Sequence, residues 1–111
     1  MKHVLWISRH EMTPEQKNDL SRVMQDEIFI HQWEESVTTW ELLLPFILQV
    51  DVIAAVLPLD YMQQLVSLAK GKMVVRSVVE RMIQPDHTVK VRHIYWQQIL
   101  KITTDVIDFN I

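Results

Sequence analysis

Short apolar runs alternate with amphipathic stretches along most of this chain. The run Val4-Leu5-Trp6-Ile7 is continuous, as in a buried strand. Residues 14–25 instead place Leu20, Val23 and Met24 on one side of a helix. Over the whole chain these patterns predict strands at 4–8, 27–32, 51–57 and 73–78, helices at 14–25, 39–49 and 60–70, and two further strands near 88–96 and 99–108.

The alternation of strands with helices predicts an α/β fold. We expect a single Rossmann-like domain spanning residues 1–111, with a mostly parallel sheet flanked by helices and a C-terminal antiparallel strand or hairpin. Residues 52–57 are all apolar, which predicts a central strand, covered on both faces, beside the first strand. The turn sequence at residues 84–87 precedes a stretch that alternates between apolar and polar residues.

The predicted helix ends carry their own signals. Thr13 is placed to cap the first helix, a proline follows it, and Gln16 is the expected capping-box partner. Gly71, the only glycine, falls where the third helix is expected to end in a left-handed residue. Pro45 would kink the second helix unless that helix begins late, near Leu43.

Composition excludes several kinds of chemistry. The chain has no cysteine, which rules out disulfides, thiolate nucleophiles and cysteine-ligated zinc. A single glycine rules out the glycine-rich loops that bind dinucleotides or nucleotide phosphates. The sequence has no close spacing of His, Asp and Glu typical of a metal site, so we expect neither a metal nor another cofactor. A hydrophobic content of 49%, with four Trp and six Met, favours a homodimer.

Charge is distributed unevenly. Residues 1–69 hold 4 basic and 10 acidic side chains, whereas residues 70–111 hold 7 and 4, within a net charge of −3. This distribution favours a small anionic ligand, bound by the basic part, over duplex nucleic acid. No apolar run approaches the roughly 18 residues of a membrane span, and the first residues do not resemble a secretory signal, so we expect a cytoplasmic protein.

The junction between the first strand and the first helix is the strongest candidate for chemistry. Ser8, Arg9 and His10 lie there, beside a helix N-terminus that favours an anion such as phosphate. Ligands of parallel sheets bind beyond the carboxyl ends of the strands, so we expect the loops after the first, third and fourth strands to form one crevice. The expected ligand-binding residues are Arg9, Thr13, Asp60, Arg76 and Ser77.

Each of these residues also has an ordinary structural explanation. Ser8, Arg9 and His10 are equally typical of a solvated strand end, and Arg76 of a surface charge. We interpret His93 as a partly buried histidine of an edge strand. The tryptophans are assigned mainly to the core or an interface, with base stacking as the alternative.

The first junction and the C-terminal stretch together resemble the small stand-alone CRISPR-associated ring nucleases, which degrade cyclic oligoadenylate second messengers. In that family the first strand ends in Ser and His before a Leu-Thr-x-x-Gln helix start, and a basic-His-apolar stretch lies near the C-terminus. The matching residues here are Ser8, His10, Met12, Thr13 and Gln16, and then Arg92, His93 and Ile94 with Tyr95 and Trp96. Arg9, between Ser8 and His10, departs from the shorter spacing of the family.

The resemblance implies a metal-independent phosphodiesterase that acts through a ribose 2′-hydroxyl and leaves a cyclic phosphate end. It implies a two-fold ligand bound across a homodimer. It also implies that His10 and Ser8 are catalytic, with His10 moving a proton. Arg9, Arg76 and the N–H groups of the first helix would then offset charge in the transition state.

Two other functions remain open from the sequence. One is a non-catalytic interaction module, encoded on a mobile element, that meets a protein partner through an apolar surface around Trp33, Trp40 and Met62. The other is a sensor that binds a small molecule in the same crevice without catalysis. The nucleotide hypothesis requires a concave surface at Arg9 and His10. Binding of nucleotide by a dimer would favour it, and indifference to all nucleotides would favour the interaction module.

Overall fold

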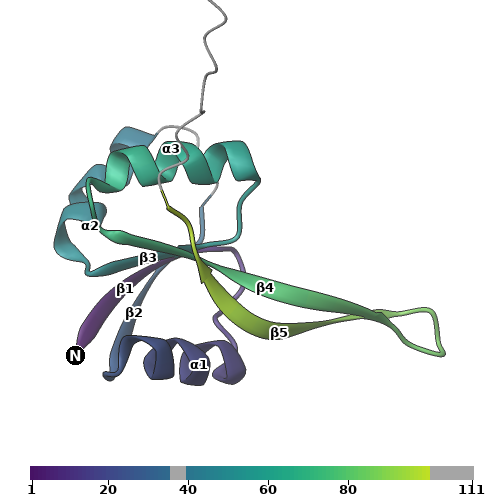
Figure 1. Ribbon diagram of the computed structural model, residues 1–111. Coiled ribbons are helices and arrows are strands. Elements are labelled where there is room, and N and C mark those ends of the chain that lie inside the picture. Colours follow the sequence, from purple (N-terminus) through teal and green to yellow (C-terminus); the bar gives the residue numbers. More distant parts are fainter. Residues whose placement is uncertain (36–39, 101–111) are drawn as a thin grey trace, which may run out of the picture.

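The fold is a single five-stranded sheet with helices on both faces, as seen in a computed structural model that describes residues 1–35 and 40–100 (Figure 1). α1 covers one face, whereas α2 and α3 cover the other. In chain order the elements are β1 (Lys2–Ile7), α1 (Pro14–Met24), β2 (Ile28–Trp33), the 3₁₀ helix η1 (Trp40–Leu42), α2 (Leu44–Gln49), β3 (Val52–Ala55), α3 (Leu59–Ala69), β4 (Met73–Ile83) and β5 (Val89–Gln98).

The strand order is β2-β1-β3-β4-β5. β1 pairs in parallel with β2 and β3, and β3 pairs in parallel with β4, so the predicted place of the third strand beside the first is confirmed. β5 pairs antiparallel with β4 and closes a hairpin at the edge of the sheet. The prediction of an α/β fold with a mostly parallel sheet and a C-terminal hairpin is therefore confirmed.

Each sheet face carries its own apolar cluster, as alternation along the strands requires. On the α1 face, Trp6 and Leu20 pack with Trp96, whose ring meets that of Trp6 edge-on at 6.0 Å. On the other face, the cluster contains Leu5, Ile53 and residues of α2 and α3. β3 is buried at all four positions, which explains its uninterrupted apolar sequence.

The helix ends follow the residues that predicted them. The Thr13 side chain accepts from the backbone N–H of Gln16, and the Gln16 side chain accepts from that of Thr13, which completes the capping box. α2 begins only after Leu43, with Pro45 in its first turn, so the late start is the correct alternative. α3 ends in left-handed backbone at Lys70, followed by Gly71 at φ +90°.

The β4–β5 hairpin is longer than predicted and projects from the rest of the sheet (Figure 1). β4 continues to Ile83, where the sequence pattern predicted an end at residue 78. The predicted turn is confirmed, with Asp86 accepting from the backbone and side chain of Thr88. The last predicted strand, 99–108, lies outside the described residues from position 101 onward.

Across residues 1–35 and 40–100, none of the helices has both the length and the apolar character needed to cross a membrane.

Candidate functional site

A first hollow lies where the sheet changes the direction of its connections. α1 leaves β1 toward one face and α3 leaves β3 toward the other, so a gap opens between the ends of these adjacent strands, as expected for an open parallel sheet. We call it the switch-point hollow; its volume is about 370 Å³. It is lined by Ile7, Ser8, Arg9, His10, Glu35, Val56, Leu57, Pro58 and Tyr61.

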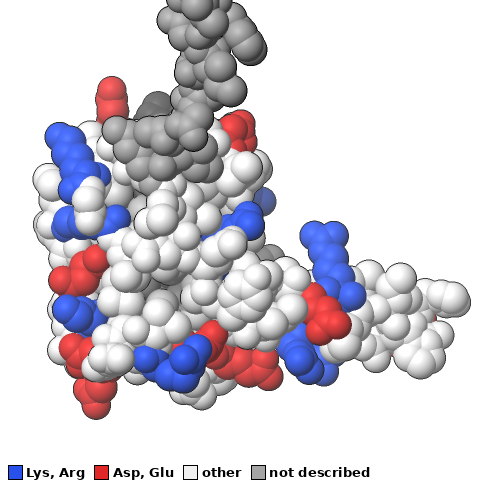
Figure 2. Space-filling view, in the orientation of Figure 1, with Lys and Arg blue, Asp and Glu red and all other residues white. Residues whose placement is uncertain are grey.

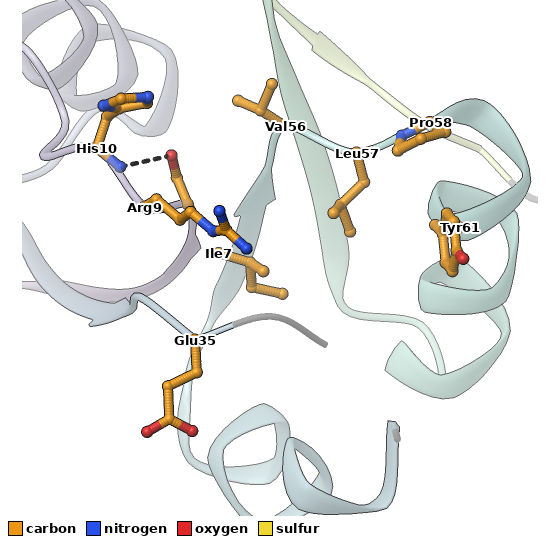
Figure 3. A pocket seen from close by; sticks show the side chains of 9 residues that line it. Ile7, Arg9, His10, Glu35, Val56, Leu57, Pro58 and Tyr61 are labelled. Carbon is orange, nitrogen blue, oxygen red and sulfur yellow. Dashed lines mark hydrogen bonds between the residues drawn. The ribbon is translucent and has the colours of Figure 1, made fainter. Parts of the chain in front are cut away.

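Arg9 and His10 turn to different sides of this junction (Figure 3). The Arg9 guanidinium extends toward Ile7 and the loop after β3, whereas the His10 ring points away from that loop. The peptide between them is held in place, because the Ser8 hydroxyl accepts from the backbone N–H of His10 at 3.1 Å. The His10 carbonyl also accepts from the Trp6 indole at 2.8 Å, which anchors the junction to the core.

A second and larger hollow lies between the start of α1 and the β4–β5 hairpin. We call it the hairpin hollow; its volume is about 820 Å³. It is lined by Trp6, Ser8, His10, Glu11, Thr13, Pro14, Glu15, Gln16, Val56, Val79, Arg81, Lys90, Val91, Arg92 and His93. Ser8, His10 and Val56 line both hollows, so the two meet at the β1–α1 junction.

The hairpin hollow combines basic and apolar surface. Arg81, Lys90 and Arg92 contribute three positive charges, and Glu11 and Glu15 on the opposite side contribute two negative ones. Several valines and the edge of a tryptophan supply the apolar part. Such a surface matches a ligand with a flat apolar portion and an anionic portion.

The residues predicted from the sequence are distributed over these hollows unequally. Arg9 lines the switch-point hollow, and Thr13 lines the hairpin hollow. Asp60, in the first turn of α3, and Arg76, on β4, line neither of them. Arg76 faces the α2–α3 side of the sheet, where its guanidinium donates to Gln97 at 2.8 Å.

Ser77 lies on the opposite face of β4 from Arg76 and belongs to a hydrogen-bonded network. Its hydroxyl oxygen is 3.2 Å from Gln16 Nε2 and 2.5 Å from His93 Nδ1. The other ring nitrogen, His93 Nε2, is 2.7 Å from Asp19 Oδ2. A serine, a histidine and an aspartate from β4, β5 and α1 are thus connected in series beside the hairpin hollow.

Both ends of this network determine where its protons are. Asp19 accepts at its carboxylate, so His93 carries a proton on Nε2. At the other end, Gln16 Oε1 accepts from Thr13 within the capping box, so its Nε2 donates to Ser77. In the neutral imidazole, His93 Nδ1 therefore carries a lone pair and accepts a hydrogen bond from the Ser77 hydroxyl.

Asp19 is the charged end of the network. The hydrogen bond from His93 has the largest effect and lowers the pKa of this carboxyl. Desolvation opposes it, and the Arg22 guanidinium, at 2.7 Å, lowers the pKa further. The carboxylate is therefore ionised at neutral pH. The His93 side chain is only 4% exposed, so it is held between the helix and the hairpin.

A β-bulge brings His93 to this face, and this is why sequence analysis did not place it in the site. Ser77 pairs with Trp96, and Val79 pairs with His93, so β5 has one extra residue, Ile94, between these pairs. Strict alternation puts positions 93 and 96 on opposite faces of a strand. The bulge places both on the α1 face, where their rings are 5.3 Å apart.

The three residues named in the interaction hypothesis, Trp33, Trp40 and Met62, are buried to different extents. Met62 is completely buried, and Trp33 and Trp40 pack against the core. Leu42 and Leu48, which sequence analysis did not select, are more than half exposed. Met62 therefore contributes no surface for a partner, whereas Trp33 and Trp40 remain partly exposed at the edge of the core.

No protein-family model, curated protein or solved structure matches this chain. Within residues 1–35 and 40–100, the structure contains no group of three or more His, Cys, Asp or Glu side chains that could hold a metal ion. The two hollows and the side chains that line them are therefore the features that bear on function.

Proposed function

We propose that this protein binds a phosphate-bearing nucleotide, of the cyclic oligoadenylate type, in the hairpin hollow, and that it cleaves a phosphodiester bond of this ligand without a metal. The observation that carries the proposal is the make-up of the hollow: three basic side chains lie opposite the β1–α1 junction, with apolar surface between them. Phosphates pair with the arginines and the lysine. A base fits against the valines.

The two stretches that resemble the ring nucleases support this assignment. Ser8, His10, Thr13 and Gln16 line one side of the hairpin hollow, and Arg92 and His93 line the other, although about eighty residues separate them in the sequence. The strand order, with helices leaving β1 and β3 to opposite faces, fits the Rossmann-like arrangement expected of such a protein. A nucleotide of this kind also fits a cytoplasmic location.

In the proposed reaction His10 moves a proton at the ligand. It lies at the meeting point of the two hollows, so its imidazole is accessible to a phosphodiester held by the hairpin. Arg81, which lies on the α1 face of the hairpin, offsets the negative charge that grows on the phosphorus oxygens. Ser8 orients the His10 backbone through its hydroxyl.

Isothermal titration calorimetry and product analysis with cyclic oligoadenylates of several ring sizes, with AMP as a comparison ligand, test this proposal. Arg81→Ala, on the α1 face of the hairpin, is expected to weaken binding at least about tenfold, because a hydrogen bond to a charged group is removed. Arg76→Ala, on the other sheet face, is the matched control and should leave the affinity unchanged. His10→Ala should bind normally and lose turnover.

The proposal fails if no cyclic oligoadenylate binds the wild-type protein. Unchanged turnover by His10→Ala would exclude this residue as the proton carrier. Binding without any turnover, by the wild-type protein, would favour the sensor function at the same hollow.

We also propose that the protein is a homodimer, joined through the projecting hairpin. Ile83 and Val89 pair on one face of this two-stranded ribbon beyond the hairpin hollow, and Ile83 is 80% exposed. A two-stranded ribbon with an uncovered apolar face is marginal in water. The hairpin also carries Arg81, Lys90 and Arg92, whereas residues 1–69 carry a net charge of −6, so charge favours a second copy as the partner.

A further inference from the structure

We infer that Ser77 is a nucleophile activated by His93 and Asp19. This role rests on the proposed function only in that the substrate is taken to be a phosphodiester. The three side chains supply a hydroxyl, a base within hydrogen-bonding distance of it, and a carboxylate that orients the base. These are the parts that define nucleophilic catalysis by serine. The arrangement differs from the usual triad in one respect. Here the serine is hydrogen-bonded to Nδ1 of the histidine and the carboxylate to Nε2, whereas in the usual triad the two nitrogens have exchanged roles.

The order of protons in the network is the one that activation needs. Because Asp19 fixes the proton on Nε2, the basic lone pair of His93 faces the Ser77 hydroxyl. Gln16 donates to the Ser77 hydroxyl oxygen, so within the network only His93 can accept the Ser77 hydroxyl proton.

The place of the network is also appropriate for a site. Ser77 is partly exposed, and its two neighbours in the network, Gln16 and His93, both line the hairpin hollow. Arg81 lies four residues along β4 from Ser77 and on the same face, so an extended ligand that Arg81 holds by one phosphate can present another phosphodiester to the Ser77 hydroxyl. β-Bulges occur preferentially next to active sites, and one lies directly beside His93.

The reaction then has two balanced steps. In the first, Ser77 Oγ bonds to phosphorus, its proton passes to His93 Nδ1, and the bond from phosphorus to the leaving ribose oxygen breaks as His10 protonates that oxygen. In the second, water attacks phosphorus, His10 takes its proton, and Ser77 leaves with the proton from His93. Asp19 remains a carboxylate throughout and stabilises the imidazolium.

A ligand-independent experiment tests this assignment. Purified protein is incubated with diisopropyl fluorophosphate, and adduct formation is followed by intact mass and peptide mass spectrometry. We expect one adduct, on Ser77, that is absent from Ser77→Ala. His93→Asn and Asp19→Asn should slow labelling about 100-fold or more, because general-base assistance is lost. Ser67→Ala, which removes an exposed serine of α3 away from the network, is the matched control and should label normally.

The outcomes separate this inference from the proposed function. Labelling that depends on His93, in a protein that binds no nucleotide, would support the nucleophile and overturn the substrate class. Nucleotide cleavage by a protein that is not labelled, or is labelled equally without His93, would overturn the nucleophile. If the proposed function and the Ser77 nucleophile both hold, a cyclic oligoadenylate that lacks 2′-hydroxyls is still cleaved. A ribose nucleophile would require those groups, so loss of cleavage would overturn the role of Ser77.

Discussion

Asp19 is the residue whose ionisation matters most for the hydrogen bonds between α1 and the hairpin. Its pKa is lower in the folded protein than in the unfolded chain, chiefly because His93 donates to the carboxylate. Stability from this interaction is therefore fully present above the unfolded pKa of about 4, and it is lost as the pH falls through the lower folded value. The contact between helix and hairpin should weaken in acid.

Asp19→Asn is expected to lower the free energy of unfolding at pH 6 by about 1 to 2 kcal/mol, because a charged hydrogen-bond acceptor is lost. The deficit should shrink below about pH 4, where the wild-type carboxyl is protonated as well. Urea unfolding at several pH values measures it. Glu34→Gln, at an exposed carboxylate, is the control, and a deficit independent of pH would contradict the assignment.

Single residues could be predicted from the sequence where the signal is local. Thr13 and Gln16 form the expected capping box, because that motif depends only on a spacing of three residues. Ser8 and His10 lie at the concave junction where they were expected. The partnership of Ser77 with His93 was not predictable, because it depends on an extra residue in β5 that no sequence pattern marks.

At the scale of elements, the first turn of α1 supports both the helix and the network. The same Gln16 side chain that completes the capping box also donates to Ser77. The cap therefore fixes which way this amide points.

Thr13→Ala should lower the free energy of unfolding by about 1 kcal/mol, as expected for the loss of an N-cap. Denaturant unfolding measures the change, and circular dichroism checks that the helix content is retained. Ser67→Ala, at an exposed position inside α3, serves as the comparison and should be neutral or slightly stabilising. Equal losses in the two variants would show that Thr13 does not act as a cap.

Most elements were predictable because their periodicity is strong. β1, α1, β2 and α3 lie where the pattern placed them, to within a few residues at each end. The second helix was less certain because a proline falls within it, and it is in fact shorter than predicted. The length of β4 was missed, since its outer part is exposed on both faces and lacks the apolar alternation of a covered strand.

At the scale of the whole molecule, the hairpin determines the expected assembly. Its apolar side chains project past the body of the protein, where Figure 2 shows charged side chains at its base and mainly uncharged surface toward its tip. We expect light scattering to give twice the chain mass of 13.2 kDa. Covering Ile83 and Val89 would remove the most exposed apolar surface of the hairpin.

Ile83→Glu should weaken the dimer at least about tenfold, because it places a charge in the proposed contact. Sedimentation at several concentrations gives the dissociation constant. Leu48→Glu introduces the same charge at another exposed apolar position, on α2, and should leave the dimer intact. A wild-type protein that is monomeric at all concentrations would exclude this assembly.

The fold as a whole was predictable because strand and helix alternate regularly and each carries a clear apolar face. The site was only half predictable. Loops after β1 and β3 meet as the topology requires, but Arg76 and Ser77, adjacent in sequence, face opposite sides of the sheet. Adjacent residues of a regular strand point to opposite faces, so Arg76 and Ser77 do not contribute to the same site.

The extra residue in β5 has one more consequence. Deleting Ile94 would leave every strand pair and the faces of β4 unchanged, because Tyr95 would then follow His93 directly and His93 would still lie opposite Val79. What the extra residue adds is local curvature, since a bulge bends its strand and increases the twist. Its removal would straighten the ribbon and alter the angle at which the hairpin leaves the sheet, and the width of the opening between hairpin and helix would change with that angle.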